Sequence, residues 1–326
     1  MTALLITVDT ELSAAMQQRG VSLADNVRSS IWGEAGGRAV GIGWQMDVMD
    51  RHGLKGVFFL DPMPALVHGP AWLEPVVAAI VARGHEVQLH IHSEWLAWAP
   101  QSPVEGRQGR NIGDFSLADQ IVLLGLARDL LEQAGAPRIT AFRAGNFGAN
   151  DDTLRALAAI GLEWDSSVNP AYIGRECGIA LDPAAIDPVR RLGMAELPVS
   201  GISDRPGHFR PAQLCALSAS EMRAGLHHAT RARHAAFVVV THSFEMLSRD
   251  RKRPNLMVMR RLERLCAAAA RAGGVSPAGF SDLSPALADR PAGPEERVAP
   301  SRLRTGIRVA QQLWATWRYE RRLLPV

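Results

Sequence analysis

Three residues with metal-binding side chains stand close together where an apolar run of the sequence ends. His90, His92 and Glu94 alternate with other residues, shortly after Gly84. On an extended strand, residues two apart point to one face, so both histidines could grip one divalent ion with Glu94 beyond them on the same side. The alternative is a hydrogen-bonded histidine at a strand end beside two solvated groups. Three potential ligands in so short a stretch favour a metal or catalytic site.

A second pair of reactive side chains follows the apolar run at residues 3–8. Asp9 and Glu11 would share one face there. One carboxylate can bind a metal ion while the other takes a proton from water. The alternative is that Asp9 or Thr10 caps the N-terminus of a helix.

The elements that must position these groups are short apolar strands that alternate with helical patterns, which indicates parallel β/α units. Polar residues follow most of these strands, and such strand ends form the active sites of α/β barrels and open sheets. A long polar loop around residues 12–37 is expected to cover the site. The predicted strands comprise residues 3–8, 57–60, 139–142, 195–200 and 236–240, and a further strand that delivers His90 and His92.

Length and composition fit a globular enzyme. The chain has 326 residues, 47% of them hydrophobic and 21% charged, enough for one barrel-sized domain with additions or for two small domains. Residues 1–3 lead directly into the first strand without a basic segment, and no apolar stretch reaches about 18 residues. A cytoplasmic location is therefore expected.

The composition changes after residue 285. A proline- and glycine-rich linker is predicted around residues 289–294, and the tail from Arg297 holds seven arginines against Glu320. Domain boundaries at 1–285 and 286–326 follow. The tail is predicted to form a basic amphipathic helix that either lies on an anionic membrane or packs on the domain. No nucleic-acid partner is expected, because no recognised binding motif accompanies the charge. The apolar positions that suggest the helix are Leu303, Ile307, Ala310, Trp314, Trp317 and Leu324.

Taken together and in order, four segments of the chain resemble the motifs of the polysaccharide deacetylases of carbohydrate esterase family 4, which share the nodulation-type deacetylase homology domain. The resemblance covers residues 3–284 and implies a distorted (β/α) barrel. Residues 164–167 and 196–199 also resemble segments of the bacterial surface-polysaccharide members. The four motif-like segments are residues 8–11, 84–94, 142–146 and 240–242.

The chain also departs from the family pattern. The family places two histidines four positions apart, and here Glu94 occupies the second position while His92 is additional. Asp9 and Glu11 replace an adjacent pair of aspartates. Gly145 and Asn146 stand in the region where the family carries proline and tyrosine. Whether His92 or Glu94 is the third ligand therefore stays open.

The resemblance implies a divalent metal ion, with zinc as the first candidate and cobalt, nickel or iron as alternatives. Glu11, His90, and His92 or Glu94 would hold the ion. Asp9 would be the catalytic base and Arg143 would orient it, while His242 would protonate the departing amine. The side chains expected to contact substrate are Trp95, Trp98, Asn146 and Glu245.

The function expected from the resemblance is hydrolysis of an acetamido group on an amino sugar, in the synthesis of surface polysaccharide or lipopolysaccharide. The protein would be cytoplasmic and could sit at the inner face of the membrane. One alternative is a metal-independent C–N hydrolase of a small non-sugar amide, and another is a catalytically silent sugar-binding protein. An amidohydrolase barrel with a His-x-His motif is disfavoured, because that motif belongs on the first strand and here follows the third.

Overall fold

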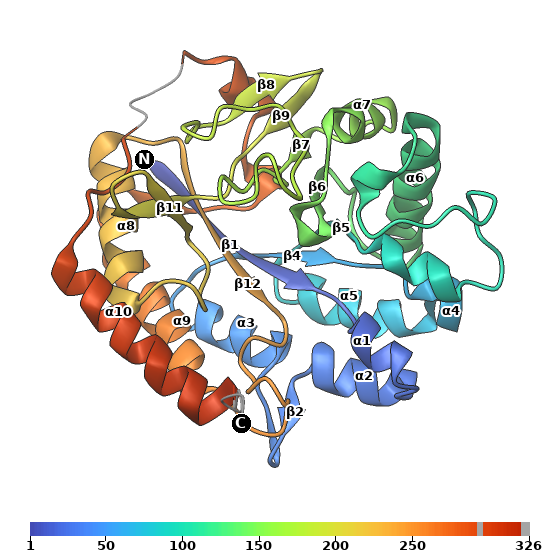
Figure 1. Cartoon of the computed structure of the whole chain (residues 1–326), viewed down its shortest axis with the longest axis horizontal. Coiled ribbons are helices and arrows are strands. Elements are labelled where there is room, and N and C mark those ends of the chain that lie inside the picture. The colour runs from blue at the N-terminus through green and yellow to red at the C-terminus, as the bar shows by residue number, and fades with distance from the viewer. Residues whose placement is uncertain (292–295, 321–326) are drawn as a thin grey trace.

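The structure, a computed structural model, describes residues 1–291 and 296–320 and is a mixed α/β fold (Figure 1). Its large sheet curls into a half-barrel in which β1 is the second strand in the order, between the edge strand β12 and β4. Two strands complete the sheet at its margins: β8 (Val189–Arg191) runs antiparallel to β9, and β13 (Val275–Pro277) pairs with the start of β1. This architecture confirms the expected distorted (β/α) barrel. In spatial order, the parallel strands are β12 (Ala236–His242), β1 (Thr2–Thr10), β4 (Gly56–Leu60), β5 (Glu86–Ile91), β6 (Ala141–Ala144), β7 (Trp164–Asp165) and β9 (Met194–Glu196).

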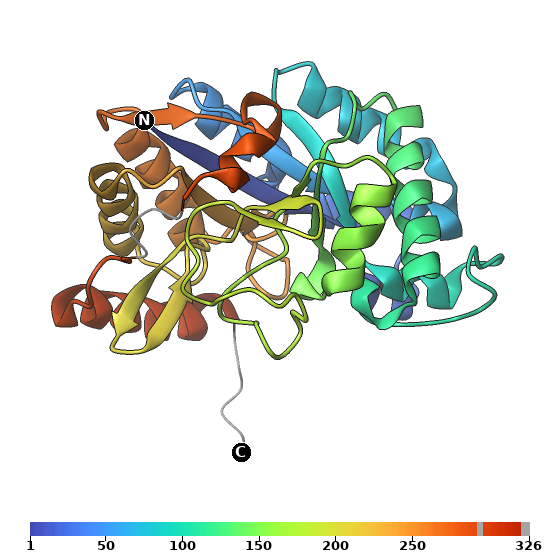
Figure 2. The same cartoon turned by 90° about the horizontal axis from the view of Figure 1, so that it is seen from above.

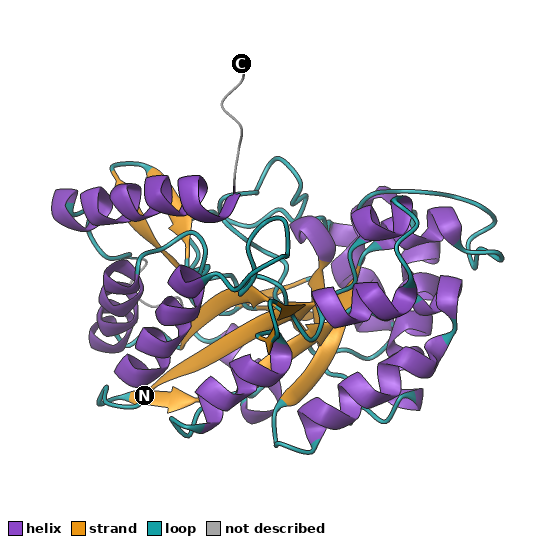
Figure 3. Ribbon diagram, turned by 90° about the horizontal axis from the view of Figure 1, so that it is seen from below, coloured by secondary structure: helices purple, strands orange, loops and turns teal. Residues whose placement is uncertain are grey.

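Helices cover the outside of the sheet (Figure 3). Several begin at a polar side chain that accepts a hydrogen bond from the backbone of the first turn, as Ser116, Asn150 and Ser218 do. Their apolar faces form one continuous core with the outer face of the strands. The main helices are α3 (Ile42–Asp50), α5 (Leu73–Val81), α6 (Leu117–Gln133), α7 (Asp151–Ala159), α8 (Ala219–Ala232) and α9 (Leu256–Ala269), and a short α4 (Ala65–His68) follows β4.

The inner face of the sheet changes from apolar to polar along each central strand. Ala3 and Leu5 of β1 belong to the inner core. The next residues with the same alternation are Thr7, Asp9 and Glu11. Because the strands are parallel, their polar ends meet at one edge, and that edge carries the candidate site.

The edge of the half-barrel next to β12 is bridged by an irregular segment. The amide of Leu214 donates to the carbonyl of Val240, and the amide of Val240 donates to the carbonyl of Ala212. Residues that precede α8 thus lie beside β12 and bring Gln213 to the same end of the barrel as His242.

The polar segment at residues 12–37 is not the long loop that the sequence suggested. It contains two short helices, α1 (Ala14–Gln18) and α2 (Leu23–Ser30), and strand β2 (Glu34–Ala35), which forms a hairpin with β3 (Arg38–Ala39) just beyond the segment. Ser13 and Ser22 cap the two helices. The prediction was wrong because the polar residues here serve as caps and turns of short elements.

The C-terminal segment forms α10 (Arg302–Ala315) and the π-helical turn η7 (Thr316–Glu320). Figure 2 shows α10 along one side of the molecule, beside the hairpin of β10 (Gly201–Arg205) and β11 (His208–Pro211). Residues 292–294 of the predicted linker, and Leu324, lie outside the described residues. Among the described helices, none is both long and apolar enough to cross a membrane.

Candidate active site

The strand ends place the predicted site residues at one edge of the sheet. Asp9 lies beside His242 in the parallel pairing of β1 and β12, and His90 lies beside Arg143 in the pairing of β5 and β6. Glu11 follows β1 directly. Segments that are far apart in the sequence therefore meet because their strands share one direction and one end.

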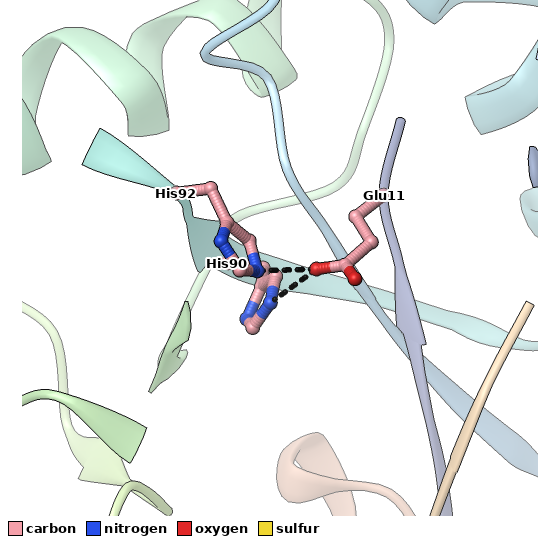
Figure 4. Close-up of side chains that lie close together, drawn as sticks. All are labelled: Glu11, His90 and His92. Atoms are coloured by element: carbon pink, nitrogen blue, oxygen red, sulfur yellow. Dashed lines mark hydrogen bonds and ion pairs between the residues drawn. The ribbon is translucent and has the colours of Figure 1, made fainter. Parts of the chain in front are cut away.

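Glu11, His90 and His92 converge on one point (Figure 4). One ligand atom from each residue lies within 4.8 Å of the others, and Oε2 of Glu11 is 3.3 Å from Nε2 of His90. The same carboxylate oxygen contacts Nε2 of His92. Two imidazole nitrogens and one carboxylate oxygen are the protein ligands of several catalytic zinc sites, so this donor set fits a divalent ion.

Each of the two histidines is oriented by a partner on its other ring nitrogen. Nδ1 of His90 lies 2.8 Å from the carbonyl oxygen of Arg143, and Nδ1 of His92 lies 3.2 Å from Oε2 of Glu94. An acceptor at Nδ1 holds a proton there, so Nε2 is the ring nitrogen that faces Glu11 and could bind a metal ion. Glu94 thus lies outside the converging group and holds His92.

Glu11 and His92 each shift the pKa of the other. Burial tends to raise the pKa of the Glu11 carboxyl, but the charge of His92 and hydrogen bonds from His90 and His92 hold this pKa well below its usual value. Burial tends to lower the pKa of His92, whereas Glu11 raises it well above the usual value. The ionised Glu11 carboxylate therefore pairs with a protonated His92, and a divalent ion bound here would take the place of the proton on Nε2.

Asp9 is buried beside Glu11 and is held by Arg143. The guanidinium donates to Oδ1 of Asp9 at 2.8 Å and to the hydroxyl of Thr7 at 2.7 Å. It also donates to the carbonyl and hydroxyl oxygens of Ser166, and it lies 4.4 Å from the ring centre of Phe59. This arrangement fixes both side chains and leaves Oδ2 of Asp9 facing the cleft side, 3.9 Å from Nε2 of His242.

His242 completes the group from the end of β12. Its Nδ1 lies 2.9 Å from Oε1 of Glu245, which also accepts a hydrogen bond from Gln213. Burial tends to lower the pKa of His242, but the hydrogen bond and charge of Glu245, together with the charge of Asp9, raise the pKa to about 9. The imidazole therefore carries a proton at neutral pH and can donate it from Nε2.

These groups line a cleft of about 240 Å³. Beyond the predicted residues, an aromatic pair forms part of its wall: the rings of Phe147 and Tyr172 stack with centres 5.3 Å apart. Such flat apolar faces are suited to contact with a sugar ring. The lining residues are Asp9, Glu11, His90, His92, Arg110, Ala144, Asn146, Phe147, Tyr172, Glu176, Gln213 and His242.

The residues expected to contact substrate occupy different positions. Asn146 lines the cleft in a left-handed conformation, and its side chain bonds Asn111. Trp95 is fully buried, and Trp98 packs edge-on against it with ring centres 5.5 Å apart. Neither tryptophan is among the residues that line the cleft, whereas Phe147 and Tyr172 are. Glu245 holds His242 and does not line the cleft.

One acidic residue of the site was missed from the sequence. Asp61 follows β4, which lies between β1 and β5, and its side chain is completely buried. Its Oδ1 accepts a hydrogen bond from the amide of Met63, while Oδ2 has no hydrogen-bond partner among the described residues. Burial raises its pKa to about 7, against the nearby charges of His92 and His90. The signal was a carboxylate directly after the predicted strand at residues 57–60.

Comparison of the sequence with protein-family models and with curated proteins finds no match. Among solved structures, a "putative polysaccharide deacetylase" from Mycobacterium smegmatis matches with a TM-score of 0.57 and 18% identity, over 92% of this chain and 94% of that one. A family 4 carbohydrate esterase from Streptomyces lividans matches with a TM-score of 0.43 and 13% identity, over 92% and 98% of the two chains. A family 4 pseudoenzyme from Bacillus anthracis matches with a TM-score of 0.42 and 9% identity, over 84% and 63%. The likeness to the mycobacterial protein shows a shared fold.

Proposed function

We propose that the protein is a metal-dependent N-deacetylase that hydrolyses the acetamido group of an amino sugar. The observation that carries the proposal is the convergence of Glu11, His90 and His92 beside a separate buried carboxylate, Asp9, and a protonated imidazole, His242. The fold shared with the mycobacterial protein and the resemblance of the strand-end motifs to carbohydrate esterase family 4 support it.

The proposed metal ligands are Glu11, His90 and His92, with Glu94 as the partner that orients His92. A divalent ion bound there would polarise the amide carbonyl and make a water molecule more acidic. Zinc is our first candidate because the donor set is two imidazoles and one carboxylate, and cobalt, nickel and iron share these ligands.

The chain's own residues would carry the protons. Asp9, held by Arg143, would take a proton from the water that attacks the carbonyl carbon. His242 would give its proton to the nitrogen as the carbon–nitrogen bond breaks, which yields acetate and a free amine. Glu245 would stabilise the imidazolium until that transfer. Acid and base thus belong to different strands, β12 and β1.

The aromatic pair of Phe147 and Tyr172 would bind the sugar face, and Asn146 would bind its polar groups. The resemblance of residues 164–167 and 196–199 to the surface-polysaccharide members supports a precursor of surface polysaccharide or lipopolysaccharide as substrate. A cytoplasmic location remains part of the proposal, and fractionation of cells that express the natural chain tests it.

Acetate release from a panel of N-acetylated amino-sugar oligosaccharides tests the proposed reaction. Wild-type protein reconstituted with zinc is compared with the same protein after chelation and with Asp9→Asn. We expect acetate only from the metal-loaded wild type. Equal activity after complete metal removal would instead support the metal-independent amide hydrolase, and sugar binding without turnover by metal-loaded protein would support the silent binding protein.

A further inference from the structure

Helix α10 and the turn η7 direct their polar side toward the protein and their apolar side toward solvent. The exposed side chains include Leu303 at 74%, Leu313 at 68% and Trp317 at 74%. We call this side the outer face. Its residues are Arg302, Leu303, Gly306, Ile307, Val309, Ala310, Leu313, Trp314, Trp317 and Arg318. The side turned toward the protein carries Arg304, Thr305, Arg308, Gln311, Gln312, Ala315, Thr316 and Tyr319.

Buried polar contacts fix this orientation. Arg308 is buried between two carboxylates: Nε donates to Oε1 of Glu221 at 3.0 Å, and an Nη donates to Oδ2 of Asp204 at 2.7 Å. Gln311 accepts a hydrogen bond from Arg261, and Thr305 donates to the carbonyl of Asp204. Turning the helix over to bury its apolar side would take the guanidinium away from buried Glu221 and would leave Asp204 with Arg210 and His208 as its remaining charged partners. The exposed apolar face is therefore a fixed feature of the folded protein.

The dimensions and composition of the outer face suit a membrane interface. The 14 residues of α10 make a helix about 21 Å long, too short to span the hydrocarbon core but able to lie along its surface. Trp314 and Trp317 are side chains that favour the boundary between lipid and water. Arg302 and Arg318 lie at opposite ends of the face, and residues 302–319 contain no acidic side chain. The face is therefore complementary to an apolar surface with negative charge.

A second copy of the chain is a poorer fit. Packing two outer faces around a two-fold axis with antiparallel helices would bring Arg302 of one copy toward Arg318 of the other. The outer face itself contains no carboxylate that would offset that repulsion. Anionic lipid headgroups would instead neutralise both arginines.

We propose that the outer face of α10 and η7 docks on an anionic lipid membrane.

The docked turn η7 would also contact the loop that follows His242. The amide of Arg249 donates to the carbonyl of Tyr319 at 3.2 Å, and the Arg251 guanidinium lies 4.5 Å from the ring centre of Phe244, which contacts His242. Docking would thus place the membrane beside the loop that follows His242. The proposal concerns binding alone and does not depend on the reaction.

Co-sedimentation with vesicles tests the proposal on the full chain. Wild type is mixed with phosphatidylcholine vesicles, with or without phosphatidylglycerol, and compared with Leu303→Gln/Leu313→Gln/Trp317→Gln. A control, Val122→Gln/Leu256→Gln, changes apolar residues that are 46% and 42% exposed on α6 and α9. Circular dichroism and thermal unfolding establish that each variant is folded. Arg302→Gln/Arg318→Gln tests the charge.

We expect wild type and control to bind the phosphatidylglycerol vesicles, and the triple variant to bind at least about tenfold more weakly. The arginine variant should lose most of the preference for anionic vesicles. Wild type that remains in solution with both vesicle types, or a folded triple variant that binds as well as wild type, would overturn the proposal. Light scattering that shows a dimer, abolished by the triple variant, together with no vesicle binding would assign the face to a second copy.

Discussion

Glu245 forms a hydrogen bond with His242, in which Oε1 of the glutamate and Nδ1 of the imidazole are 2.9 Å apart. The opposite nitrogen, Nε2, is 3.9 Å from Oδ2 of Asp9. The glutamate therefore fixes the tautomer and the charge of the imidazole, while the nitrogen that would donate a proton faces the proposed base. The contact between Glu245 and His242 therefore sets the pH range in which His242 can act as an acid while Asp9 acts as a base.

Replacing Glu245 by glutamine should shift the alkaline limb of the activity profile. His242 can act as an acid only while protonated, so the activity of wild type should fall as pH rises through about 9. Without the glutamate charge, burial lowers the pKa of His242, and the limb should move down by at least about one pH unit. The profile of kcat/KM against pH measures this. Glu176→Gln, which changes an acid that lines the cleft, is the control, and an unmoved limb in Glu245→Gln would contradict the proposed role of His242.

The same pair should affect stability in a defined pH range. The pKa of His242 is higher in the folded protein than its ordinary value of 6.5, so its stabilising contribution is fully present below pH 6.5 and is lost as pH rises through about 9. In denaturant unfolding, the free energy of unfolding of wild type should decline between pH 6.5 and about 9. The decline should be smaller in Glu245→Gln. Parallel declines in the two proteins would show that the pair does not stabilise the fold.

The metal content of variants should distinguish the three proposed ligands from Glu94, which contacts His92. We expect Glu11→Ala, His90→Ala and His92→Ala to lose stoichiometric metal, because each contributes an atom to the converging group. Glu94→Gln should keep the metal with an affinity lower by about 10- to 100-fold, since it alters only the partner of Nδ1. Elemental analysis and competition with a chelator measure both effects. Complete metal loss in Glu94→Gln would make Glu94 a ligand.

Removing the Arg143 guanidinium should destabilise the fold strongly. Arg143→Met leaves Asp9 buried without its ion-pair partner, and such a loss costs about 3–5 kcal/mol. Arg138→Met is the matched control, because Arg138 is exposed and its pair with Glu163 lies at the surface, where about 1 kcal/mol or less is expected. Urea unfolding compares the two variants, and similar losses in both would argue against a structural role of the buried pair.

The aromatic wall of the cleft should act on binding more than on turnover. Tyr172→Ala removes one ring of the stacked pair, and we expect KM for an amino-sugar oligosaccharide to rise by about tenfold with little change in kcat. Trp98→Phe should leave both constants unchanged, because Trp98 packs against Trp95 and is not among the cleft-lining residues. Steady-state kinetics of the two variants measure these effects. A higher KM in Trp98→Phe with an unchanged KM in Tyr172→Ala would place the sugar on the tryptophans.

The strand ends could be predicted from the sequence because an apolar run that stops at a polar residue is a local signal. Asp9, Glu11 and His90 were found in this way. His92 also obeyed the alternation because its backbone remains extended, at φ −109° and ψ 99°. From Ser93 the chain turns into a 3-10 helix (Ser93–Trp98), so Glu94 folds back on His92 and Trp95 enters the core.

Other parts of the site depend on strand order, which no local pattern contains. Asp61 belongs to the site only because β4 inserts between β1 and β5 in the sheet. Phe147 and Tyr172 meet across loops, and Gln213 reaches Glu245 through the irregular segment beside β12. These contacts join residues whose partners can be identified only after the sheet has been assembled.

The long sequence separations within the site also bear on how the protein folds. The bond between Asp9 and Arg143 joins residues 134 positions apart, and Glu11 meets His90 across 79 positions. Contacts of this kind close large loops and form slowly, after the intervening β/α units have begun to pack. A metal ion that requires Glu11, His90 and His92 together would therefore bind only chains whose central strands have already paired. The rate of metal uptake during refolding would then report the completion of the barrel, and early intermediates would be unable to capture the ion.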